Sequence, residues 1–241
     1  MLITCCVFVC EVRMDLRMLT LGNLKENFDG RLGVGIGGAI ALLLSAVLPA
    51  LAHHPTGGKT PTTIFDALMS GLAHPVIGID HLAFVMASGL LGAAIGAGLT
   101  IPIAFVGASI AGAGLHLAGL ELPAVEWLIA ASVLAFGILL ALRSPPDSPL
   151  MVTVAAIAGI FHGYAYGESI LGAEMGPLLA YLLGFAVIQL AIATAAWGLG
   201  QAALDKLAEP SGLALRFAGF VVCGVGATLL STLITDAIFP A

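Results

Sequence analysis

Long apolar stretches without a single charged residue dominate the chain after residue 80. They cover residues 82–120, 127–142, 148–167, 175–204 and 217–235. A transmembrane helix needs about 20 mostly apolar residues, so these stretches indicate several crossings. Glycine- and proline-containing junctions divide them further. The pattern predicts six spans, at about 76–97, 99–118, 122–142, 150–171, 177–200 and 213–235.

The composition indicates that these apolar stretches lie in a lipid bilayer. Of the 241 residues, 60% are apolar and only 9% are charged, whereas soluble domains carry about 25% charged residues. This excludes a soluble globular domain, a disordered chain and a nucleic-acid-binding protein. Runs of small residues such as GAAIGAG at 92–98 let helix backbones approach closely. We therefore expect an all-α integral membrane protein, a compact bundle of about six transmembrane helices.

The amino-terminal segment has the features of a signal peptide. Residues 31–52 combine a basic residue, an apolar run and small residues at Ala50 and Ala52, which fit cleavage after Ala52. This predicts a leader over 1–52 and a membrane domain over 53–241. The alternative is an uncleaved first transmembrane helix. Residues 62–72 are too few to cross, so we expect them to lie at the interface or to dip in and return.

Basic residues set the expected orientation. Beyond residue 58 the only Lys and Arg residues are Lys59, Arg143, Lys206 and Arg216. Cytoplasmic loops carry an excess of Lys and Arg. With an external amino terminus and six crossings, three of these four residues fall at the cytoplasmic ends of spans.

Ionisable side chains inside the predicted spans are few, and the orientation places all of them in the outer half of the bilayer. They are His74, Asp80, His81, His116, Glu126, His162 and Glu168. Such groups are costly in lipid and usually mark an ion or proton path. In one straight helix, His74, Asp80 and His81 would not all face the same ion. The same holds for His162 and Glu168. We therefore expect a site shared between the first and fourth spans, with irregular backbone near Pro75–Gly78, as in transporters with broken helices.

Simpler roles stay open for several of these polar residues. His116 at a helix end can be an interfacial hydrogen-bonding residue, and Glu126 can anchor the interface in water. Tyr164 and Tyr166 are expected in packing or in an aromatic belt, and Gln189 in a hydrogen bond between helices. Imidazole and carboxylate without thiolate suit nickel, cobalt or zinc, and these metals overlap in affinity.

Two motifs resemble the HupE/UreJ family of nickel permeases over roughly residues 50–237. They are HPVIGIDH at 74–81 and His162-Gly163 followed by Glu168. The resemblance implies secondary transport of Ni²⁺ or Co²⁺ across the bacterial inner membrane, with a periplasmic mature amino terminus. It implies that His74, Asp80, His81, His162 and Glu168 handle the metal, with His116 and Glu126 carried over less securely. Met86 departs from the family, in which a methionine often follows the DH pair by four residues rather than five.

The expected function is therefore a permease and not an enzyme. The metal is the transported substrate, and no prosthetic group is implied. The expected partners are the metal ion and the lipid bilayer, with a homo-oligomer left open and nucleic acid excluded. No nucleotide-binding GxxxxGK[ST] motif occurs, so transport is expected to be passive or driven by a gradient or potential. The alternative is an intramembrane zinc-dependent hydrolase that uses the same His/Asp cluster.

Overall fold

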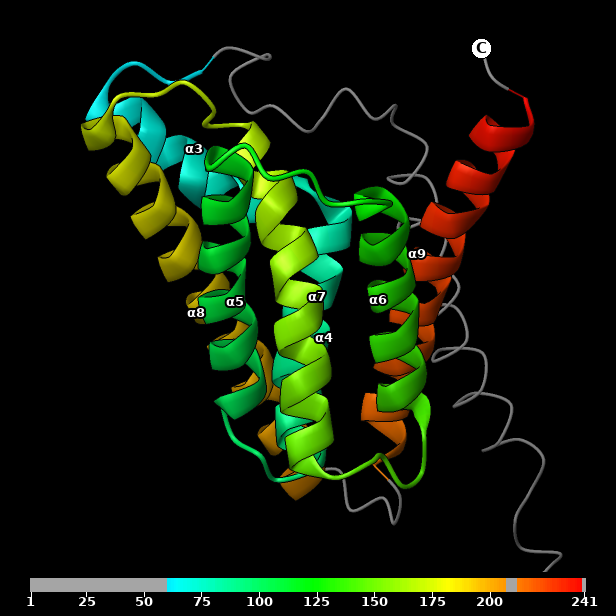
Figure 1. The fold of residues 1–241 in the computed structure, drawn as a ribbon. Helices are drawn as coiled ribbons and strands as arrows, with labels where there is room; N and C mark the ends of the chain where they lie inside the picture. The colour runs from blue at the N-terminus through cyan, green and yellow to red at the C-terminus, as the bar shows by residue number, and fades with distance from the viewer. Residues whose placement is uncertain (1–59, 207–211, 240–241) are drawn as a thin grey trace, which may run out of the picture. The chain divides into compact units, whose positions relative to one another are not determined.

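The structure is a computed structural model that describes residues 60–206 and 212–239. The described residues all belong to one compact unit. The predicted leader and its cleavage site lie outside the described residues. The described elements are α-helices, which confirms the all-α class (Figure 1): α3 (Ile64–Ile77), α4 (Ile79–Ala94), α5 (Thr100–Leu117), α6 (Val125–Ala141), α7 (Ser148–Glu168), α8 (Met175–Lys206) and α9 (Leu213–Ile238).

Most of these helices are long and apolar enough to cross a membrane. In the described part of the chain, α5, α7, α8 and α9 each meet this condition, and α3 and α4 meet it together as one bent pair. Helix α6 has 17 residues, which is the short end of the range of about 17–25 residues for a spanning helix. Figure 1 shows α6 running beside α7. The protein is a multi-pass membrane protein, and the predicted total of six spans is reached only if this short helix also crosses.

The first span differs from its prediction, because it is a broken helix that begins at Ile64. Helices α3 and α4 meet at an angle of 77°. Gly78 separates them with an extended backbone (φ −72°, ψ 104°), and its N–H closes α3 on the carbonyl of His74. Most of residues 62–72, which were expected to lie at the interface or to dip in and return, form the first half of this bent pair. The irregular backbone expected near Pro75–Gly78 is confirmed.

Packing against α8 favours a single span for the bent pair. Gly184 of α8 lies against the backbone of Leu68 and Leu72 in α3, whereas Gly200 lies against Ala93 in α4. The two halves thus advance in the same direction along one continuous helix. A re-entrant loop would reverse direction, so this packing favours a single discontinuous span.

Small residues bring the other helices together, as the sequence predicts. A side chain at Gly163 of α7 would collide with the backbone of Ser109 in α5, and one at Gly226 of α9 with that of Leu134 in α6. In lipid, association depends on such close packing because the hydrophobic effect supplies little drive between helices. These contacts hold α7, which carries part of the site, against α5.

Gly112 and Gly114 offer a direct test of this packing. A Cβ at Gly112 would collide with the backbone of Ile160, whereas one at Gly114 would meet nothing within 4 Å. We expect Gly112→Ala to lower the free energy of unfolding by about 1–3 kcal/mol, as overpacking usually does. Gly114→Ala should be neutral or slightly stabilising, because alanine is the better helix former. Thermal unfolding of both variants in detergent measures the difference, and equal midpoints would contradict the close α5–α7 contact.

A buried histidine cluster at the helix break

Four ionisable residues of the two sequence motifs gather in the interior of the bundle. His74 lies in the last turn of α3, Asp80 and His81 lie in the first turn of α4, and His162 lies on α7. Their exposed fractions are small: His74 3%, Asp80 6%, His81 1% and His162 0%. In a straight helix His74 and His81 would lie about 10 Å apart along the axis. The break at Gly78 instead brings their ring centroids to 5.7 Å.

The shortest contact in the cluster joins two histidines from different helices. The Nδ1 atoms of His81 and His162 lie 2.8 Å apart. On its other side, Nε2 of His162 lies 2.9 Å from the hydroxyl oxygen of Ser132 on α6. That hydroxyl donates to the carbonyl of Ile129 at 2.7 Å. The cluster therefore joins residues of the first and fourth predicted spans, and α6 contributes Ser132 to it.

His74 is held by the hydroxyl of Ser169, which directly follows α7, and by that of Tyr181 in α8. Its Nδ1 lies 3.0 Å from the hydroxyl of Tyr181 and 3.2 Å from that of Ser169. Tyr181 donates to the carbonyl of Tyr166 at 3.2 Å. The ring of Tyr166 packs against both imidazoles, with centroids 4.9 Å from His74 and 4.2 Å from His81. These contacts orient the imidazoles of the broken span.

Asp80 supplies the negative charge of the cluster. Its Oδ2 lies 3.7 Å from Nε2 of His81. Among the buried polar residues that the structure describes, Asp80 is the only carboxylate. A buried carboxylate beside imidazoles favours a cation at this position.

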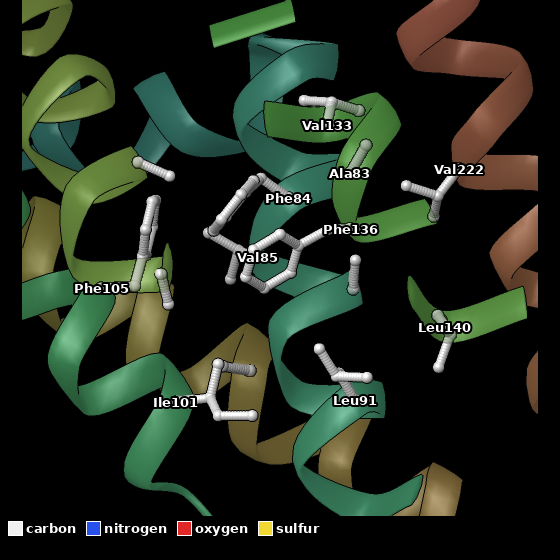
Figure 2. Close-up of a cluster of buried hydrophobic side chains, with 14 of the residues drawn as sticks. Ala83, Phe84, Val85, Leu91, Ile101, Phe105, Val133, Phe136, Leu140 and Val222 are labelled. Carbon is white, nitrogen blue, oxygen red and sulfur yellow. The ribbon is translucent and has the colours of Figure 1, made fainter. Parts of the chain in front are cut away.

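Three phenylalanine rings close one side of the cluster. Phe84 lies 4.5 Å from Phe105 and 4.3 Å from Phe136, between ring centroids. Figure 2 shows these rings gathered between α4, α5 and α6. His162 packs directly on this layer, 4.8 Å from Phe84 and 5.3 Å from Phe105. Phe84 follows His81 along α4, and Phe136 follows Ser132 along α6, so the layer lies beyond the cluster in the direction in which these helices run.

The remaining predicted residues lie outside the buried cluster, near the opposite side from the phenylalanines. Glu168 ends α7 and Glu126 begins α6, and both are exposed. His116 is half-buried near the end of α5, with its ring 4.5 Å from that of Tyr164. Figure 1 shows these three helix ends at the same end of the bundle. Within residues 60–206 and 212–239, no three His, Cys, Asp or Glu side chains are placed to hold one metal ion together.

Several residues of the site were missed or assigned another role from the sequence. Ser132 and Tyr181 were not singled out, although Ser132 is the only hydroxyl residue of α6. Tyr166 was expected in packing or in a belt, and it packs directly on the histidines with no exposed surface. The prediction that Gln189 forms a hydrogen bond between helices is wrong, because its amide donates to the carbonyl of Phe185 in its own helix.

Comparison with known proteins gives one family and one relative. The family model described as "HupE / UreJ protein" matches residues 40–229. "Protein HupE" of Rhizobium leguminosarum bv. viciae is 30% identical over 190 residues, which cover 78% of this chain and 94% of that protein. No solved structure matches the chain.

Proposed function

This chain belongs to the HupE/UreJ family, and from that premise we propose that it is a secondary transporter for a divalent transition metal. The family is associated with nickel and cobalt uptake, and its members are described as metal transporters rather than enzymes. The proposed substrate is Ni²⁺ or Co²⁺, carried through the histidine cluster into the cytoplasm. The hydrolase alternative loses support from this membership.

The observation that carries the proposal is the pair of imidazole nitrogens 2.8 Å apart, from α4 and α7. Metal–imidazole bonds are about 2.0–2.1 Å long for a dication such as zinc, so two such ligands at right angles lie about 3 Å apart. A metal ion can therefore join His81 and His162 with little movement of either helix. His74 and Asp80 bring a third imidazole and a carboxylate to the same interior. This donor set suits nickel and cobalt and does not suit magnesium or calcium.

The rest of the bundle supports a direction for transport. Arg143 follows α6, and Arg216 lies in the first turn of α9, where it donates to the carbonyl of Ala141 at 3.0 Å. The rule that basic residues favour the cytoplasm makes this the inner end. The end with His116, Glu126 and Glu168 is then periplasmic, and its carboxylates attract a cation toward the cluster. We propose that the phenylalanine layer closes the cytoplasmic side until the helices move.

Uptake by bacterial cells tests this proposal. Cells that express the protein should accumulate radioactive nickel above cells that carry an empty vector. Unlabelled cobalt should compete, whereas excess magnesium should not, because magnesium prefers oxygen ligands. Acidification should weaken uptake, since the neutral imidazole binds the metal. If the protein reaches the membrane and no dication accumulates, the transport proposal fails; chelator-sensitive cleavage of an amide or ester lipid would support the hydrolase instead.

A further inference from the structure

Ser132 occupies a position that the proposed function does not explain. It lies on α6, outside both sequence motifs, yet it contacts the one histidine that α7 contributes. We infer that Ser132 is a positioning residue: it holds His162 in the tautomer whose Nδ1 lone pair faces His81, which makes Nδ1 the metal-binding nitrogen. This inference rests on the proposed function.

The tautomer follows from the single proton of the serine hydroxyl. That proton is donated to the carbonyl of Ile129 at 2.7 Å. Toward Nε2 of His162, 2.9 Å away, the hydroxyl oxygen can therefore only accept. Nε2 must carry the hydrogen, and in a neutral imidazole the other nitrogen then has a lone pair. Ser132 thus directs Nδ1 of His162 toward His81.

The same logic describes the partner ring. Because Nδ1 of His162 accepts, Nδ1 of His81 carries the hydrogen of their 2.8 Å contact. When a metal ion takes the place of that hydrogen, His81 remains a neutral imidazole if it carries a hydrogen on Nε2 instead. That atom lies 3.7 Å from Oδ2 of Asp80, so the two groups must approach by about 0.5 Å before the carboxylate accepts a hydrogen bond from it. Each imidazole then turns Nδ1 to the ion and Nε2–H to an oxygen, which is the usual arrangement behind metal-binding histidines.

Another buried serine shows why the contact at Ser132 is distinctive. Ser109 of α5 is fully buried and donates to the carbonyl of Phe105 in its own helix at 2.9 Å. Back-bonding of this kind is common for serine in helices and needs no function. Ser132 makes a similar bond to Ile129, but its oxygen also meets a histidine of another helix. Ser109 is therefore a matched control for removal of a hydroxyl from the bundle.

Two variants whose side chains match each other in shape separate the effect of the hydroxyl from the effect of shape. Ser132→Thr keeps the hydroxyl, whereas Ser132→Val has the shape of threonine without the hydroxyl. We expect Ser132→Val and Ser132→Ala to raise the KM for nickel uptake about 10–100-fold, the usual cost of losing a partner behind a metal ligand. Ser132→Thr and Ser109→Ala should keep a KM close to that of the unchanged protein. The visible absorption bands of Co²⁺ bound to the purified protein should shift in Ser132→Val and not in Ser132→Thr.

Two results would overturn the inference. One is an unchanged KM in both Ser132→Val and Ser132→Ala while His162→Ala abolishes uptake, which would leave the proposed function in place. The other is an equal loss in the threonine and valine variants, which would show that only side-chain shape matters at this position. Normal uptake by His162→Ala would instead contradict the proposed function itself.

Discussion

Alanine at His81 or at His162 is expected to reduce nickel and cobalt uptake to the level of cells that lack the protein. The two Nδ1 atoms lie 2.8 Å apart in a fully buried contact, so each variant removes half of the pair. The loss should exceed the roughly 10–100-fold that follows removal of a partner behind a ligand. Because the two imidazoles act as one unit, the double variant should lose no more than either single one. Initial rates of tracer uptake, scaled to the amount of protein in the membrane, measure the effect.

His116 provides the matched control for this experiment. It is also an intramembrane histidine, but it is half-buried near the end of α5 and packs on Tyr164. We expect His116→Ala to retain most of the uptake, with a moderate rise in KM if the residue attracts the cation at the outer end. A complete loss in His116→Ala, together with normal uptake in His81→Ala, would place the binding site at the helix ends and not in the buried cluster.

The all-α class and most of the spans could be predicted because the bilayer constrains them strongly. Each crossing needs a long apolar segment, and the charge-free stretches therefore mark the spans. The shape of the first span could not be predicted in the same way. The stretch over 62–72 contains Asp66 and is too short to cross alone, so its continuation through Gly78 into α4 was not recognised. Whether a helix that stops at a glycine resumes at a bend depends on packing, here against α8.

The ionisable part of the site could be predicted from the cost of burying such groups in lipid. That reasoning identified His74, Asp80, His81 and His162, which the structure brings together. It does not distinguish Ser132 or Tyr181, because hydroxyl residues are tolerated in transmembrane helices through bonds to their own backbone. Only the packing of α6 and α8 brings these two hydroxyl groups into contact with the histidines.

Glu168 illustrates the limit of reasoning from spacing. It lies six residues after His162, about 120° around an ideal helix. The structure keeps α7 helical to Glu168 and leaves that side chain exposed. No local unwinding brings the carboxylate to the buried histidines, so its participation in metal handling stays a prediction. An exposed position at the end of α7 fits attraction of a cation better than a permanent bond to it.

Asp80→Asn is expected to have the second large effect on uptake. The substitution removes the negative charge and leaves the shape of the side chain almost unchanged. Asp80 is the only buried carboxylate that the structure describes. Two unit charges 4 Å apart interact by about 4 kcal/mol at an effective dielectric constant of 20, and a dication doubles this. Desolvation offsets part of the gain. Even half of it, about 4 kcal/mol, corresponds to a change of about 1,000-fold in affinity. Asp80→Asn should therefore abolish uptake at low nickel concentration while the protein still reaches the membrane.

The charge argument can be separated from a structural role of Asp80 by two further variants. Asp80→Glu keeps the negative charge at the cost of one extra methylene, so it should recover part of the uptake. Glu121→Gln removes a carboxylate from an exposed position between α5 and α6, where solvent and salt screen its charge, and it should leave the KM almost unchanged. Raising the nickel concentration should partly restore uptake in Asp80→Asn, because the variant weakens binding and leaves the phenylalanine layer intact. A wild-type KM in Asp80→Asn would show that the dication does not depend on this carboxylate, and the metal would then have to bind elsewhere.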